Sequence, residues 1–184
     1  MAQNVEIKAR IDSSEFELIR QRAAAIATGG PILLNQTDTF FKATNGRLKL
    51  REFDNGSAEL IAYERPDCKG PKTSTYVRAA CDGETMLLAL SRSLGVVGVV
   101  KKSREVYLVD QTRIHLDQVD GLGTFLELEV VLKIPKEQES SNPADEPSLE
   151  QGVKIAQTIL DKLNVAESNL ISGAYLDLLQ NLQV

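Results

Sequence analysis

Cationic side chains recur at every second position in two segments of the sequence. Arg47, Lys49 and Arg51 alternate with leucines, and Lys102 and Arg104 have the same spacing later in the chain. Side chains two residues apart point to the same face of a β-strand, so each segment presents a row of positive charge. Neighbouring like charges in a sheet repel one another. Such rows therefore need a counter-anion, either from carboxylates elsewhere in the protein or from a ligand.

Acidic side chains with the same spacing could supply a second kind of binding group. Glu127 and Glu129 share one strand face, Asp117 shares another with Arg113 and His115, and the first strand mixes both signs. Arg and Lys bind phosphate oxygens, and Arg can do so with two parallel hydrogen bonds. Carboxylates bind Mg²⁺, which is a hard ion that prefers oxygen. Cation rows that face a glutamate pair therefore suit a metal–polyphosphate ligand.

A plainer interpretation is an antiparallel sheet with one solvated face, where Lys and Glu serve only solubility. More than half of the 21 Lys and Arg residues lie in the expected strands, which favours a specific role for the strand faces. The chain contains no G-x-x-x-x-G-K-[ST] motif. A phosphate site would therefore consist of side chains rather than of a glycine-rich loop.

The elements that carry these residues are mostly strands, because apolar and polar residues alternate along them. We expect strands at residues 5–11, 34–42, 46–53, 58–65, 75–80, 97–109, 113–119 and 125–134. We expect helices from a capping box at Ser14 and Glu17 to a point before Gly29, and at residues 82–94, 148–163 and 166–182. Short hairpin-like links join the strands, so the sequence predicts an α+β fold with one large antiparallel sheet. A closed barrel is favoured because closure removes the sheet edges.

The whole chain limits the partners further. Its 184 residues fit one domain, and its net charge of −5 argues against bulk binding to nucleic acid or to an anionic membrane. No apolar run reaches the length of a membrane span and the N-terminus carries charges, which predicts a cytoplasmic protein. Cys68 and Cys81 are accordingly expected to be reduced. The polar segment 135–147 carries three prolines and is predicted to be a mobile loop.

Several segments, in order along nearly the whole chain, resemble the CYTH superfamily of triphosphate tunnel metalloenzymes. The first-strand signature of that family, ExExK, corresponds here to Asn4-Val5-Glu6-Ile7-Lys8. The other matching segments are QTDTFF at 36–41, GRLKLRE at 46–52, ERPD at 64–67, KKSREVYLV at 101–109 and RIHLDQVDGLGTFLELEV at 113–130. The tail, YLDLL at 175–179, is more similar to the class IV adenylyl cyclase branch than to the thiamine-triphosphatase branch.

The resemblance implies that residues 1–184 form a single CYTH domain, an eight-stranded antiparallel tunnel whose charged strand faces point inward. It also implies a divalent metal, Mg²⁺ or Mn²⁺, held by Glu6, Glu127 and Glu129. The catalytic residues that it implies are Glu6, Lys8 and Asp117, the last near the metal or a reacting hydroxyl. The substrate-binding residues that it implies are Lys8, Arg10, Arg47, Lys49, Arg51, Arg65, Lys102, Arg104 and Arg113.

The sequence departs from the family signature at Asn4, where the first Glu belongs. An Asn offers a carbonyl oxygen but no charge, so metal binding should be weaker than in the family or only one of two metal sites should remain. His115 is expected to line the tunnel or support it rather than act as a general base. Tyr175 is expected to pack on the barrel, and Phe40 and Phe41 are expected to belong to the core rather than to a nucleobase platform.

Three functions follow from the resemblance. The first is an adenylyl cyclase, which converts ATP to cyclic AMP and pyrophosphate. The second is a triphosphatase that hydrolyses tripolyphosphate, thiamine triphosphate or a nucleoside triphosphate, and the third is a non-catalytic triphosphate binder. The partner is in each case a small-molecule triphosphate, not nucleic acid or a membrane. A homodimer is compatible with all three.

Overall fold

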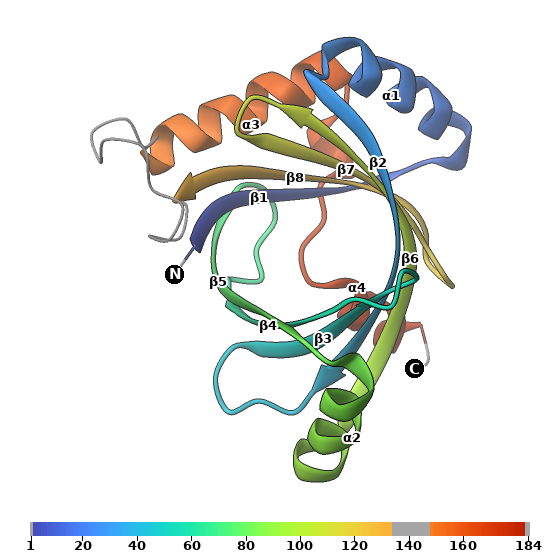
Figure 1. Cartoon of the computed structure of the whole chain (residues 1–184). Helices are drawn as coiled ribbons and strands as arrows, with labels where there is room; N and C mark the ends of the chain where they lie inside the picture. The colour runs from blue at the N-terminus through green and yellow to red at the C-terminus, as the bar shows by residue number, and fades with distance from the viewer. Residues whose placement is uncertain (1, 134–147, 183–184) are drawn as a thin grey trace.

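Eight antiparallel strands form a closed barrel, as the sequence predicts (Figure 1). The computed structural model describes residues 2–133 and 148–182, so the predicted loop at 135–147 lies outside the described residues. The strands are β1 (Ala2–Ile11), β2 (Gly29–Phe41), β3 (Arg47–Phe53), β4 (Ala58–Glu64), β5 (Lys72–Cys81), β6 (Val96–Val109), β7 (Thr112–Val119) and β8 (Gly123–Lys133). Their order around the barrel is β1-β5-β4-β3-β2-β6-β7-β8.

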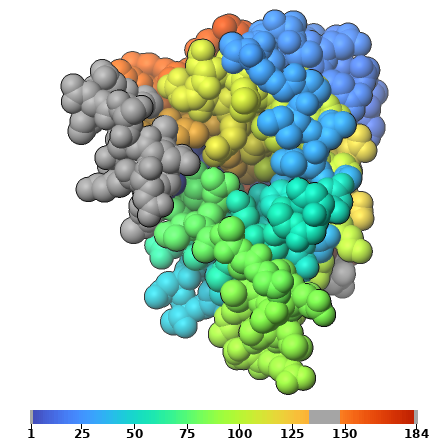
Figure 2. Space-filling model, in the orientation of Figure 1, coloured from blue at the N-terminus to red at the C-terminus, as the bar shows by residue number. Residues whose placement is uncertain are grey.

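Within residues 2–133 and 148–182, four α-helices lie outside the ring of strands. They are α1 (Ser13–Ile26), α2 (Gly83–Leu94), α3 (Leu149–Leu163) and α4 (Tyr175–Asn181). Helices α1 and α3 lie next to each other across one side of the barrel, and α2 covers the opposite side (Figure 1). In the space-filling view α2 projects from the lower end of the molecule (Figure 2). None of the helices among the described residues has the length and apolar character needed to cross a bilayer.

The main hydrophobic core lies between the barrel and helices α1 and α3, not inside the barrel. Ile7 of β1, Leu128 of β8 and Ile114 of β7 are all buried at this interface, where they meet Phe16 of α1 and Leu160 of α3. Because side chains alternate along a strand, apolar residues on the outer face place the intervening residues inside. Packing of the helices against the outer face thus leaves the barrel interior to polar side chains.

A smaller cluster anchors α2. Phe41 and Leu50 on the outer face of β2 and β3 pack with Met86 and Leu87 of the helix. The N-cap is Asp82, as expected, and its carboxylate accepts a hydrogen bond from the backbone N–H of Thr85 at 2.8 Å. Helix α2 therefore covers part of the outer barrel surface that α1 and α3 leave uncovered.

Three local expectations were wrong. Helix α1 is capped by Asp12, whose carboxylate accepts from the Ser14 N–H, so the expected capping box does not form. Strand β2 begins at Gly29 rather than at residue 34, because its first residues pair with the end of β6. The expected helix at 166–182 is helical only in a short 3₁₀ turn (Glu167–Asn169) and in α4. Between them, Leu170 pairs with Ala9 of β1, and this pairing interrupts the helix.

Candidate functional site

The barrel encloses a cavity of about 380 Å³, lined by side chains from all eight strands. Eight cationic and five anionic side chains line it, a surplus of three positive charges when all are ionised, in a chain whose net charge is −5. The cations are Lys8, Lys49, Arg51, Arg65, Arg78, Lys102, Arg104 and Arg113. A concave, poorly solvated site with excess positive charge concentrates the field and attracts anions.

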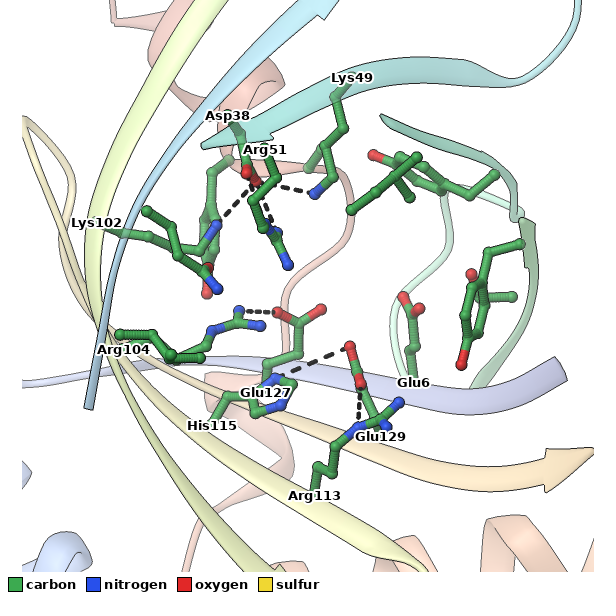
Figure 3. Close-up of a pocket in the computed structure, with 18 of the residues that line it drawn as sticks. Glu6, Asp38, Lys49, Arg51, Lys102, Arg104, Arg113, His115, Glu127 and Glu129 are labelled. Atoms are coloured by element: carbon green, nitrogen blue, oxygen red, sulfur yellow. Dashed lines mark hydrogen bonds and ion pairs between the residues drawn. The ribbon is translucent and has the colours of Figure 1, made fainter. Parts of the chain in front are cut away.

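Asp38 of β2 holds three of these cations together on one wall of the cavity (Figure 3). Its carboxylate, 2% exposed, accepts hydrogen bonds from Lys49 and Lys102 at 2.9 Å and from Arg51 at 2.7 and 2.8 Å. Burial alone would raise the pKa of Asp38, but the adjacent cations hold that pKa well below its usual range. Burial lowers the pKa of Lys102 to about 7. One carboxylate therefore organises a cluster in which the cations outnumber the anion.

Arg104 of β6 is held by a second buried network. It donates to Asp117 at 2.6 and 2.7 Å and to Glu127 at 2.9 Å, while the Tyr175 hydroxyl donates to Asp117 at 2.8 Å. Asp117 is completely buried and does not line the cavity. The geometry favours Asp117 as a residue that positions Arg104 over one that touches a substrate or a metal.

The wall formed by β1 and β8 is acidic. Glu6 lies directly opposite Glu129 in the strand register, at the separation where like charges destabilise each other unless neutralised. Arg65 pairs with Glu6, and Arg113 pairs with Glu129 at 2.9 Å. Burial raises the pKa of Glu129, but His115 and Arg113 outweigh it and lower this pKa to about 2. Two glutamates thus face each other across one strand pair, and each is paired with an arginine.

His115 lines the cavity, as the sequence predicts, between these acidic and basic groups. Burial and the nearby Arg104 guanidinium lower its pKa to about 4, so the imidazole is neutral at pH 7. Its Nδ1 has no hydrogen-bond partner and lies 3.9 Å from a Glu129 oxygen. His115 therefore adds to the cavity wall a neutral imidazole, which can donate one hydrogen bond and accept another, rather than a further positive charge.

The acidic wall fits a divalent cation held jointly with a ligand. Among residues 2–133 and 148–182, no three His, Cys, Asp or Glu side chains converge as a metal cluster. Mg²⁺ commonly binds through only one or two carboxylates, with substrate phosphates and water as its remaining ligands. The Oδ1 atom of Asn4 is buried without a partner on the same strand face as Glu6. This orphaned oxygen, together with Glu6 and Glu129, is a donor set of the required chemistry.

The C-terminal segment closes one end of the cavity. Tyr175 lines it, with the Lys8 ammonium 3.9 Å from the centre of its ring, and the carbonyl of Gly173, two residues earlier, accepts from Arg65 at 3.1 Å. The Tyr175 ring also contacts Phe125, with 4.9 Å between the ring centroids. Tyr175 therefore does more than pack on the barrel, because it forms part of the cavity wall. Phe40 is buried but also lines this cavity.

Most of the predicted site residues come together in the cavity. Seven of the nine predicted substrate-binding residues line it, and so do all three predicted metal ligands. The two that do not are Arg10 and Arg47. Arg10 lies against the Phe125 ring and donates to the Leu122 carbonyl, whereas Arg47 pairs with Asp67 and Asp177. Their side chains are engaged outside the cavity.

Sequence reasoning missed other polar residues of the cavity, above all Asp38, Gln36 and Arg78. Gln36 and Asp38 lie two residues apart in β2, so their side chains share one face of that strand. Arg78 likewise shares a face of β5 with Tyr76. Strand alternation could therefore have assigned all three to a polar face. No residue of the three belongs to a row of like charges at alternate positions, which is the pattern that indicated the other site residues.

Comparisons of the sequence and of the fold with known proteins show which proteins this chain resembles. The family model described as "CYTH domain" matches residues 2–175. A curated protein of Methanocaldococcus jannaschii, named "Putative adenylate cyclase", is 28% identical and covers 95% of this chain and 97% of its own length. The solved PH1012 protein of Pyrococcus horikoshii superposes with a TM-score of 0.73 at 23% identity, over 95% of this chain and 98% of its own. A Hippeastrum protein, HpAC1, superposes with a TM-score of 0.64 at 14% identity, over 98% and 96%. Its structure is described as revealing a dominant triphosphatase activity.

Proposed function

The chain belongs to the CYTH domain family, and we propose that it binds the triphosphate group of a small-molecule substrate inside its barrel. We further propose that it acts on this substrate in a divalent-metal-dependent reaction of the adenylyl cyclase type. The observation that carries the proposal is the surplus of positive charge in the cavity of an otherwise acidic chain. An anion with several negative charges is the ligand that such a cavity favours.

The phosphate groups would bind to cations that the protein already holds in place. Lys49, Arg51 and Lys102 converge on Asp38, and Arg104 is oriented by two carboxylates. Because these side chains are buried and paired before the ligand arrives, little of their conformational entropy is left to lose on binding. Their hydrogen bonds to phosphate oxygens would be charge-assisted and bidentate where arginine is the donor.

The metal, Mg²⁺ or Mn²⁺, would be held by Glu6, Glu129 and the Asn4 side-chain oxygen, with Glu127 nearby on β8. When bound there, a divalent cation supplies charge neutralisation of phosphate oxygens and lowers the pKa of a coordinated hydroxyl or water. Arg65 and Arg113 now neutralise the two glutamates and would turn toward phosphate oxygens when a cation takes their place.

In the cyclase reaction the ribose 3′-hydroxyl attacks the α-phosphorus, the bond to the bridging oxygen of the β-phosphate breaks, and pyrophosphate leaves. Negative charge accumulates on the departing pyrophosphate, and the proton that the hydroxyl loses ends on that pyrophosphate, so the reaction balances. Lys102 and Arg104 lie on one strand face and can stabilise this charge as it develops. Lys102 and Arg104 are both buried, which strengthens each of these charge interactions.

A triphosphatase is the second candidate, in which water attacks the terminal phosphorus of tripolyphosphate, thiamine triphosphate or a nucleoside triphosphate. The fold shared with the Hippeastrum protein, whose structure is described with a dominant triphosphatase activity, favours it. The same cations serve both reactions, and only the position of the phosphorus relative to the nucleophile differs. A non-catalytic binder is the third candidate, favoured by the uncharged Asn4 in the metal site.

One experiment separates the three candidates. Purified protein is incubated with ATP, tripolyphosphate and thiamine triphosphate, each with and without Mg²⁺ or Mn²⁺, and the products are identified by chromatography. Cyclic AMP and pyrophosphate in equal amounts are expected from ATP with metal. Orthophosphate in place of both would establish the triphosphatase, and tight binding without turnover would establish the binder. Failure to bind any triphosphate would refute the whole proposal.

A further inference from the structure

The first residues of β6 form an exposed strand edge. Strand β7 pairs with β6 only from Lys102 onward, where Lys102 lies opposite Val119, so Val96–Val100 extends beyond the end of β7. Within residues 2–133 and 148–182, this segment pairs with β2 on one side and with no strand on the other. We call Val96–Val100 the free edge. It follows α2 almost directly, at the end of the barrel where that helix lies (Figure 1).

The free edge presents apolar side chains to solvent. Val96, Val97 and Val99 are 46%, 40% and 44% exposed. Exposed edge strands usually carry charged residues or proline, which prevent pairing with another chain. The sequence from residue 94 to residue 100, LGVVGVV, contains neither. The free edge therefore lacks the features that protect an edge strand from association.

Helix α4 covers only the inner side of this segment. A Cβ atom at Gly98 would lie 2.5 Å from Leu176 of α4, and Val100, which shares a strand face with Gly98, lines the cavity. Val97 and Val99 alternate with these residues and stay exposed. Among the described residues, no backbone N–H or C=O group of the free edge bonds to anything other than β2. The edge thus offers unpaired backbone groups beside apolar side chains, which is what an added strand requires.

The sequence of the free edge reads the same in both directions. Residues 96–100 are Val-Val-Gly-Val-Val. Antiparallel pairing about a two-fold axis at Gly98 would place Val97 opposite Val99 of a second copy, and Val96 opposite Val100. A two-fold interface uses the same surface on both copies and must be complementary to itself. Valine opposite valine satisfies this requirement, because β-branched side chains pack well across paired strands.

We infer that the free edge is the interface of a homodimer, in which the β6 strands of two copies pair antiparallel about Gly98. Two-fold pairing occupies the free edge of both copies, so assembly stops at two. The contact is short, because the register of β6 against β2 shifts between Val96 and Gly98 and interrupts the regular strand. The dimer is therefore weak, with a Kd on the order of 10 μM. The interface lies outside the cavity, so this inference is independent of the proposed function.

Sedimentation velocity of the parent protein across a range of about 1 to 200 μM tests for this dimer. The parent should change from monomer to dimer within that range. Val99→Lys places a charge opposite an apolar residue of the second copy and should stay monomeric throughout. Val77→Lys is the matched control, because Val77 is a 54% exposed valine of β5, three strands away from β6, and this variant should dimerise like the parent. Circular dichroism and urea unfolding check that both variants are folded.

A parent protein that is monomeric at every concentration would overturn the inference. So would a Val99→Lys variant that dimerises like the parent, or equal weakening of the dimer in the two variants, because the interface would then lie elsewhere.

Cysteine cross-linking tests the register of the two strands. In a mixture of Val97→Cys and Val99→Cys the thiols of the two variants lie directly opposite, with about 4.5–5.5 Å between Cβ atoms, whereas in either variant alone they are diagonal, at about 7–8 Å. On oxidation the mixture should form disulfide-linked dimers faster than either variant alone. The parent protein, which has only Cys68 and Cys81, gives the background. Equal rates in the mixture and the single variants would overturn antiparallel pairing about Gly98.

Discussion

Replacing Asp38 with Asn tests whether the Asp38 carboxylate occupies the position among the cavity cations that a bound anion would take. The carboxylate is the shared partner of Lys49, Arg51 and Lys102, all within 2.9 Å. Removing one partner of a buried ion pair typically costs about 3–5 kcal/mol, because the charges left behind have no partner. For a domain of this size that corresponds to a fall in melting temperature of roughly 6–20 °C. Lys102 limits the loss, because its pKa of about 7 lets it give up its proton.

Tripolyphosphate should reverse this destabilisation. In the parent protein the ligand competes with Asp38 for the three cations, whereas in Asp38→Asn it meets cations that lack a partner. The variant should therefore bind tripolyphosphate more tightly, and the ligand should raise its melting temperature more than that of the parent. Binding at 100 times Kd adds about 2.7 kcal/mol of stability, which is enough to recover most of the loss.

The assay is thermal and urea unfolding of both proteins across a range of tripolyphosphate concentrations. Asp161→Asn serves as the control, because its carboxylate lies on the exposed surface of α3 and accepts only from Gln157. Equal stability of Asp38→Asn and the parent without ligand would contradict the assigned charge cluster. Equal stabilisation of the two proteins by tripolyphosphate would contradict the idea that the ligand takes the place of Asp38.

Three further predictions concern single side chains. Asn4→Glu should tighten Mn²⁺ binding severalfold, since added ligand charge raises affinity for hard cations; equal Mn²⁺ titrations of variant and parent would remove Asn4 from the metal site. Tripolyphosphate affinity should fall as the pH rises above about 7, because Lys102 loses its charge above its pKa of about 7 and Lys8 loses its charge above its pKa of about 8. Lys102→Arg should remove the part of that decline that begins near pH 7, since guanidinium stays charged, and a calorimetric decline that still begins there would assign it to another group. Tyr175→Phe should lower the free energy of unfolding by about 1–3 kcal/mol, through loss of the buried hydrogen bond to Asp117, and urea denaturation without change would show that bond to be unimportant.

Strand alternation predicted which side chains share a face, but not which face is inside. An antiparallel sheet with one solvated face has the same pattern as a barrel with a charged interior. What distinguishes them is the helical covering: α1 and α3 bury the apolar face of β1, β7 and β8 from outside. That packing is a long-range property, and only the resemblance to a known family indicated it in the sequence.

The alternation of side chains along a strand also does not predict how far along the barrel axis a residue lies. Arg10 has the same parity as Lys8, yet the Phe125 and Tyr175 rings end the cavity before reaching it. Asp38 was missed for the opposite reason, since a single acidic residue in a strand forms no row of charges. It becomes recognisable only when β3 and β6 bring cations to it from both sides.

Calorimetric titration of tripolyphosphate into the parent protein, Arg51→Gln and Arg10→Gln tests the central claim that the barrel interior binds triphosphate. Arg51 lines the cavity. Arg10 alternates with apolar residues in the same way on β1, but its side chain lies outside the cavity. Loss of a charge-assisted hydrogen bond, worth about 1.5–3 kcal/mol, should weaken binding roughly 10- to 150-fold in Arg51→Gln, and Arg10→Gln should bind like the parent. Unchanged affinity in Arg51→Gln, or equal losses in the two variants, would contradict the tunnel site.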